Sequence, residues 1–236
     1  MQNGVTIKTS GTSGEPKEIY QSPEKIKADA LNAIDVQSIR HHSSIYTCLS
    51  LERAGGLFAQ SIPALVAGAK LKIDKFSPYQ YVREAHKYTH THLTPKQAKA
   101  VMLTKGFQEL DLNNKTFLIG SEPVTWDIIE AFLKRKAKVI LIWGMTEIGV
   151  NAIMHVFNSL NEALLIKSNA PTDATLLGNI FYCDWKIKDN CLWVRGDVCV
   201  YDGWFNTKDK AIEQNGLLYY TGRKDTLVDF NKPRKG

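Results

Sequence analysis

The chain has 236 residues, of which 44% are hydrophobic and 23% are charged, and its formal net charge is +6. These values are typical of a globular protein with one large domain, or one domain with a small appendage. No apolar run approaches the roughly 20 residues of a membrane span. The first ten residues lack the apolar segment of a signal peptide. We therefore expect a cytoplasmic protein without a membrane partner.

Up to about residue 165, short β-rich runs alternate with helical patterns. Ser22 can cap the first predicted helix and Pro23 suits its first position. The β-rich runs are residues 5–9, 45–49, 70–73, 90–93, 116–119 and 139–143, and the helical patterns are residues 23–39, 55–67, 79–86, 95–103 and 126–136. Strands separated by such helices predict an α/β fold with a mostly parallel sheet flanked by helices.

After about residue 165 the helical pattern is lost. The β-rich pieces that follow are residues 177–181, 185–187, 191–194, 198–201 and 217–220. We expect a small β-rich subdomain over residues 167–236, after an α/β core over residues 1–166. In the core, ligands should bind beyond the carboxyl ends of the parallel strands.

Residues 9–17 read Thr-Ser-Gly-Thr-Ser-Gly-Glu-Pro-Lys and follow the first predicted strand. Backbone N–H groups freed by glycine, together with hydroxyl groups, can surround phosphate oxygens, and Lys17 adds a positive charge. The common phosphate loop is excluded because Gly-Lys-Ser/Thr does not occur. By composition alone, a flexible Ser/Gly turn is the simpler interpretation.

The order of these residues closely resembles the signature of the adenylate-forming superfamily. This family includes AMP-dependent acyl-CoA synthetases and ligases, luciferases and the amino-acid-activating domains of nonribosomal peptide synthetases. The resemblance implies that the segment binds the β- and γ-phosphates of ATP. The residues it assigns to this role are Thr9, Ser10, Gly11, Thr12, Ser13, Gly14 and Lys17.

A second segment, Trp143-Gly144-Met145-Thr146-Glu147, follows an apolar strand. An aromatic ring can stack on a purine, a threonine can bond a phosphate, and a glutamate can hold Mg²⁺. The segment resembles the family's aromatic-Gly-x-Thr-Glu motif, with tryptophan in place of the usual tyrosine. The alternative is a glycine turn capped by Thr146 and Glu147.

A third segment, Gly120-Ser121-Glu122-Pro123, resembles the family turn Gly-Gly-Ala-Pro, which borders the adenine and the acyl group. Glu122 departs from that pattern. Its carboxylate either bonds the adenine amino group or faces water.

Two late segments complete the resemblance. Thr207-Lys208-Asp209 resembles the family's Thr-Gly-Asp, whose aspartate binds both ribose hydroxyls, although Lys208 stands where glycine is usual. Arg223 and Asp225 resemble the family's arginine that touches ribose or phosphate and its hinge aspartate. The alternative for this last pair is a surface ion pair, worth under about 1 kcal/mol.

The predicted strand-to-helix turn at residues 49–56 is where the family lines its acid pocket. The substrate-binding residues implied here are Glu52, Arg53, Gly55 and Gly144. Glu52 could recognise the ammonium group of an amino acid, and Arg53 could pair with a second substrate carboxylate. A Glu52–Arg53 ion pair or a helix-terminus role is the simpler interpretation.

Three histidines, His86, His90 and His92, have the residue type of metal ligands, and the last two would share one strand face. No carboxylate or cysteine has suitable spacing beside them. We therefore interpret them as ordinary polar or packed residues.

The resemblance implies ATP- and Mg²⁺-dependent activation of a small carboxylic acid to an acyl-adenylate, with release of pyrophosphate. CoA or another acceptor would follow. The implied catalytic residues are Lys17, Thr146, Glu147 and Arg223. Within the family, we interpret the chain as most similar to the short o-succinylbenzoate–CoA ligase-like proteins. A nucleic-acid partner is not expected, because the lysines are spread along the chain.

Compared with ordinary members, little sequence flanks these motifs. Eight residues precede Thr9 and eleven follow Asp225, where the family has a long stretch and a C-terminal lid. One alternative is a weak or inactive ATP- or AMP-binding protein. Another is a subunit that needs a lid-bearing partner. Apolar surface left uncovered would also favour self-association.

Overall fold

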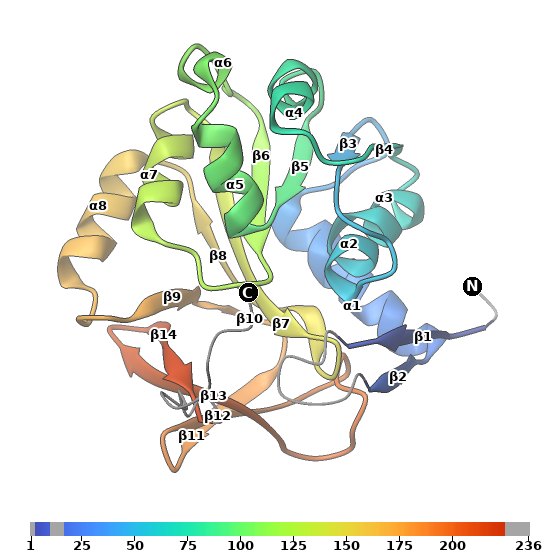
Figure 1. Ribbon diagram of the computed structural model, residues 1–236. Helices are drawn as coiled ribbons and strands as arrows, with labels where there is room; N and C mark the ends of the chain where they lie inside the picture. Colours follow the sequence, from blue (N-terminus) through green and yellow to red (C-terminus); the bar gives the residue numbers. More distant parts are fainter. Residues whose placement is uncertain (1–2, 10–16, 225–236) are drawn as a thin grey trace, which may run out of the picture.

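The computed structural model describes residues 3–9 and 17–224. Within these residues, a seven-stranded sheet has the order β10-β8-β7-β6-β5-β3-β4 (Figure 1). Its strands are β3 (Ser44–Thr47), β4 (Lys70–Ile73), β5 (His90–Leu93), β6 (Thr116–Gly120), β7 (Lys138–Met145), β8 (Gly149–Phe157) and β10 (Ile180–Phe181). Strands β3 to β7 are parallel, whereas β8 is antiparallel to both β7 and β10.

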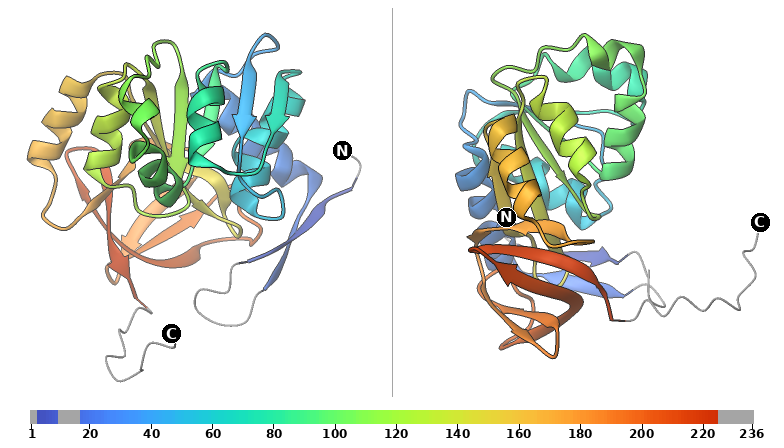
Figure 2. Two further views of the ribbon diagram at one scale, coloured as in Figure 1. Left: turned by 45° about the horizontal axis from the view of Figure 1, so that its top comes forward. Right: turned by 90° about the vertical axis from the view of Figure 1, so that its left-hand side faces the viewer.

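Helices cover both faces of this sheet (Figures 1 and 2). One face carries α1 (Pro23–Gln37), α2 (Ala54–Gly56), the π-helix η1 (Leu57–Ser61) and α3 (Ile62–Val66). The other carries α4 (Pro78–Ala85), α5 (Pro95–Met102), α6 (Lys105–Gln108), α7 (Trp126–Leu133) and α8 (Leu160–Asn169). The predicted α/β fold with a mostly parallel sheet is confirmed. No helix in the described ranges is long and apolar enough to cross a bilayer.

Helix α1 begins where its capping residues predict. The Ser22 side chain accepts a hydrogen bond from the Lys25 N–H at 3.4 Å, and Pro23 is the first helical residue. The helix ends at Gln37 and is capped by Ser38, whose φ of 56° lies in the left-handed region. Ile26 and Ala30 are buried against the sheet, which fixes α1 beside β8.

A second, antiparallel sheet has the order β11-β12-β13-β14-β9 and lies below the seven-stranded sheet in Figure 1. Its strands are β9 (Thr175–Gly178), β11 (Asp184–Lys188), β12 (Cys191–Arg195), β13 (Phe205–Gln214) and β14 (Leu217–Arg223). The late part of the chain is therefore β-rich, as expected. Helix α8 crosses position 166 and β10 returns to the large sheet, so the boundary at 166/167 stays a prediction.

The strand predicted at residues 198–201 is wrong. This segment is a turn, in which the Cys199 N–H donates to the Gly196 carbonyl oxygen at 3.0 Å. Val198 and Cys199 are buried, so their apolar character reflects packing rather than a strand. The sequence interpretation also missed β8, which is buried along nearly its whole length and therefore has no apolar–polar alternation.

Candidate functional site

The site is built around Asp209, where the two sheets meet. The Trp143 indole N–H, near the end of β7, donates to Asp209 Oδ2 at 3.1 Å. Arg223 Nη1, on β14, donates to Asp209 Oδ1 at 3.2 Å. Three residues that are far apart in the sequence thus form one hydrogen-bonded cluster.

The surroundings of Asp209 act on its pKa in two directions. Its side chain is 7% exposed, and burial raises the pKa. The positive charge of Arg223 and the hydrogen bond from Trp143 act in the opposite direction. Each carboxylate oxygen still has acceptor capacity beside the bond it accepts. The carboxylate can therefore bind two hydroxyl groups.

Lys208 adopts the conformation that a glycine would favour at its position. Its φ is 64°, in the left-handed region. The turn is held by bonds from the Lys208 N–H to Asn206 Oδ1 at 2.8 Å and from the Asp209 N–H to Thr207 Oγ1 at 3.1 Å. The lysine therefore does not prevent the turn from placing the Asp209 side chain beside Trp143 and Arg223.

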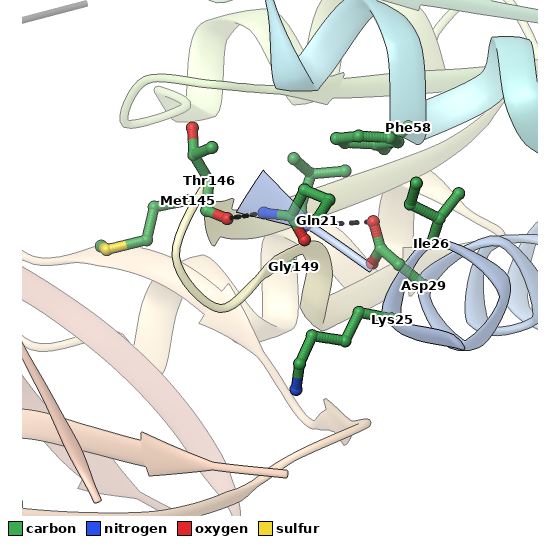
Figure 3. A pocket seen from close by; sticks show the side chains of 9 residues that line it. Gln21, Lys25, Ile26, Asp29, Phe58, Met145, Thr146 and Gly149 are labelled. Atoms are coloured by element: carbon green, nitrogen blue, oxygen red, sulfur yellow. Dashed lines mark hydrogen bonds between the residues drawn. The ribbon is translucent and has the colours of Figure 1, made fainter. Parts of the chain in front are cut away.

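The turn between β7 and β8 carries Thr146 and Glu147 and is anchored through its main chain. The Thr146 carbonyl oxygen accepts a hydrogen bond from the Gln21 amide (Figure 3). The Glu147 carbonyl oxygen accepts one from the Val200 N–H at 2.9 Å. All five residues from Trp143 to Glu147 are partly buried. The four that have side chains, which are all but Gly144, therefore reach the surface from a fixed backbone.

Gly144 allows the two strands to approach closely beside this turn. A Cβ atom at Gly144 would lie 2.1 Å from the Gly149 carbonyl oxygen. A larger residue at Gly144 would therefore displace the turn.

The predicted phosphate segment spans the connection between β1 (Val5–Lys8) and β2 (Glu18–Gln21). Thr9 and Lys17 close its base: the Thr9 N–H donates to the Lys17 carbonyl oxygen at 2.8 Å, and the Lys17 N–H donates to Thr9 Oγ1 at 3.0 Å. Ser10, Gly11, Thr12, Ser13 and Gly14 lie outside the described residues. In the described part, the Lys17 side chain is exposed and forms no ion pair with Glu147 or Asp209.

The residues predicted to bind the acid differ in their surroundings. Gly55 lies beside Ser121 of the predicted nucleotide site, because a Cβ atom at Gly55 would lie 3.0 Å from Ser121 Oγ. Glu52 and Arg53 are exposed, and the ion pair between them does not form. Arg53 instead occupies the N-cap position of α2.

The turn after β6 leaves the sheet at Gly120, which is buried, and continues through Ser121 and Glu122, which are exposed. Ser121 has a φ of 77°, unusual for a residue with a side chain. Glu122 is exposed, and its carboxylate is accessible both to water and to an adenine amino group, so both alternatives stay predictions.

Sequence reasoning missed three polar residues beside the β7–β8 turn. Gln21, Lys25 and Asp29 line a pocket together with Thr146 (Figure 3). Its volume of about 10 Å³ admits roughly one water-sized group and no nucleotide. A signal was present, because Asp29 lies next to Ala30 and three residues after Ile26, on the face of α1 that is otherwise apolar.

Known proteins resemble this chain over almost all of its length. Indoleacetate–CoA ligase from Aromatoleum aromaticum is 32% identical, over 93% of this chain and 47% of the relative. Feruloyl-CoA synthase from an Amycolatopsis species is 22% identical, over 93% of this chain and 49% of the relative. The chain thus spans about half the length of the curated relatives it matches.

Solved structures share the fold at low sequence identity. ATP-bound MatB from Rhodopseudomonas palustris superposes with a TM-score of 0.74 at 18% identity, over 92% of this chain and 47% of that one. Escherichia coli MenE, bound to an analogue of OSB-AMS, superposes with a TM-score of 0.72 at 19% identity, over 93% of this chain and 48% of that one. The family model described as AMP-binding enzyme matches residues 5–200. The chain therefore belongs to the AMP-binding enzyme family, the adenylate-forming ligases that its motifs resemble.

Proposed function

We propose that this chain is the nucleotide- and acid-binding core of an enzyme that activates a carboxylic acid as its acyl-adenylate. The observation that carries the proposal is the Asp209 cluster. A buried carboxylate at the carboxyl end of a parallel sheet, held by Trp143 and Arg223, suits the two hydroxyls of a ribose. The adjoining Thr146–Glu147 turn would then face the phosphates.

In this proposal the protein supplies placement and charge rather than a covalent intermediate. The substrate carboxylate attacks the α-phosphorus of ATP and pyrophosphate leaves. Lys17 and the Ser/Thr/Gly segment would hold the β- and γ-phosphates. Thr146 would bond the α-phosphate, and Arg223 would contact the ribose or the phosphate.

Glu147 fits a Mg²⁺ site by the chemistry of its donors. Mg²⁺ is commonly bound by one or two carboxylates together with phosphate oxygens and water. The main chain of Glu147 is fixed by Val200, and its partly buried carboxylate forms no ion pair within the described residues. When bound, the ion would neutralise part of the phosphate charge.

For the acid, the relatives favour an aromatic carboxylic acid. The curated relatives above are named for indoleacetate and for a feruloyl group. Glu52 and Arg53 are exposed, which lends no support to recognition of an ammonium group or of a second carboxylate. CoA is the acceptor that these relatives suggest.

Pyrophosphate release tests the proposal. The protein is incubated with ATP, Mg²⁺ and separate pools of aromatic acids, amino acids and dicarboxylic acids. Release that depends on the aromatic pool supports the whole proposal. Release that depends on another pool supports the proposed reaction but shows that the acid belongs to that other class. AMP binding without release from any pool identifies a non-catalytic nucleotide-binding protein.

Lys17→Ala is expected to raise the KM for ATP about tenfold, since one charge-assisted bond to phosphate is worth roughly 1.5 kcal/mol. The Thr9–Lys17 bonds use main-chain groups of Lys17, so the variant keeps them. Lys8→Ala is the matched control, because Lys8 lies on the same hairpin and its side chain forms an exposed ion pair with Glu18. Equal KM values for the two variants would remove Lys17 from the site.

A further inference from the structure

Asp29 is a buried carboxylate that the proposed reaction does not use directly. It lies on α1, is 3% exposed, and faces the beginning of β8. Its two oxygens accept hydrogen bonds from consecutive main-chain groups, the Val150 N–H at 3.3 Å and the Asn151 N–H at 3.0 Å. A helix side chain thus holds a strand that already pairs with β7.

These two bonds lie directly after the turn that carries Thr146 and Glu147. Gly149 ends the turn with a φ of 81°, and a Cβ atom there would lie 3.1 Å from Asp29 Oδ1. The carboxylate is therefore packed against the last residue of the turn as well as bonded beyond it. Figure 3 shows Asp29 and Gln21 on the same side of this turn.

Gln21 holds the same turn nearer its beginning, at Thr146. Its side chain is buried, and its amide donates to the Thr146 carbonyl oxygen. Lys25, one helical turn before Asp29, donates to the carbonyl oxygen of Cys199, next to the residue whose N–H bonds Glu147. The segment from β2 to α1 therefore bonds the turn at Thr146, bonds the strand directly after the turn, and bonds the segment that holds Glu147.

We propose that Asp29 and Gln21 are positioning residues, which fix the β7–β8 turn so that Thr146 and Glu147 meet the phosphates and the metal ion. The proposal rests on the function proposed above for that turn. It also links two parts of the site, because β2 is the strand that follows the phosphate segment. Strand β2 and the Thr146–Glu147 turn are then linked by the Gln21 side chain, and Asp29 fixes the chain directly after the turn.

Asp29→Asn tests this with little change in volume. The amide offers one acceptor where the carboxylate offers two, so either Val150 or Asn151 loses its bond. We expect the Mg²⁺ concentration for half-maximal pyrophosphate release to rise about tenfold, the size usual for losing an outer partner of a metal site. Excess Mg²⁺ should restore much of the rate, which a general loss of folding would not allow.

Two further variants complete the experiment. Asp35→Asn is the matched control, because Asp35 lies on the same helix and accepts the Tyr182 hydroxyl, a bond that asparagine can keep. Gln21→Met removes the bond to Thr146 at similar size and should also raise the Mg²⁺ requirement. The proposal is overturned if Asp29→Asn and Gln21→Met need the same Mg²⁺ concentration for half-maximal pyrophosphate release as Asp35→Asn does.

Hydrogen exchange separates this proposal from the proposed function. In Asp29→Asn, the amides of residues 146–151 should exchange faster while the rest of the chain keeps its protection. If the wild-type protein releases no pyrophosphate, the proposed function fails. The exchange result then still decides whether Asp29 fixes the turn, and unchanged protection at residues 146–148 contradicts it.

Discussion

Asp209→Ala is expected to weaken AMP binding by about 100-fold. The ribose hydroxyls would lose their carboxylate acceptor, and hydrogen bonds to a charged group are worth roughly 1.5–3 kcal/mol each. The variant also leaves Trp143 and Arg223 without the partner that they share. Titration calorimetry with AMP measures the dissociation constant directly and needs no turnover.

A matched pair on the same sheet provides the control. Asp184 on β11 pairs with Arg195 on β12 at 2.9 Å, and their side chains are 64% and 50% exposed. Asp184→Ala should leave AMP affinity unchanged and cost at most about 1 kcal/mol of stability. An Asp209→Ala variant that folds and binds AMP as Asp184→Ala does would remove the ribose site from this cluster.

Asp209→Asn separates the contribution of the negative charge to AMP binding from that of the side chain's size and hydrogen bonds. Asparagine can keep one acceptor for the Trp143 indole N–H but offers no negative charge to Arg223. We expect its AMP affinity to lie between those of the wild type and Asp209→Ala. Such an order would show that the carboxylate charge, and not only a filled space, contributes to binding.

The sequence predicted the parts of this site that lie in short motifs at strand ends. Gly120 and Trp143 follow apolar runs that the structure shows as β6 and β7, and parallel strands bring their carboxyl ends to one edge. Asp209 was found through its motif, although the surrounding β13 was not predicted. The positive φ of Lys208 shows that this lysine keeps the backbone conformation that glycine favours.

Other features depend on contacts that no local pattern contains. Strand β8 is antiparallel and buried. Its sequence therefore lacks the apolar–polar alternation from which a strand is predicted. The turn at Val198 and Cys199 has an apolar sequence like that of a strand, because both residues are buried. The roles of Gln21 and Asp29 come from partners more than 100 residues away, at Thr146 and Val150. Such pairings become visible only once the sheet order is known.

His92 on β5 is expected to make the protein sensitive to mild acid. The side chain is 1% exposed, and neither ring nitrogen has a hydrogen-bond partner among the described residues. Burial lowers the pKa of His92 to about 3. The neutral ring is therefore favoured in the folded state, whereas the unfolded chain binds a proton near pH 6.5.

The sign of the effect follows from this order of pKa values. Above pH 6.5 both states hold a neutral ring, and the contribution of His92 to stability is fully present. As the pH falls from 6.5 towards 3, the unfolded chain binds more protons than the folded protein, and stability is lost. Between pH 7.5 and pH 5 the loss from this one group should be about 2 kcal/mol.

Urea unfolding at pH 7.5 and pH 5 measures the loss in the wild type and in His92→Leu. The variant cannot titrate at this position, so its free energy of unfolding should fall by about 2 kcal/mol less than that of the wild type. His86→Leu is the control, because His86 is exposed and its removal should leave the pH dependence of the wild type nearly intact. His90 and His155, whose pKa values burial also lowers, are present in all three proteins and cancel in the comparison. If His92→Leu and His86→Leu lose the same free energy, the unfolded and folded states bind the His92 proton equally well, and the buried neutral ring does not account for acid sensitivity.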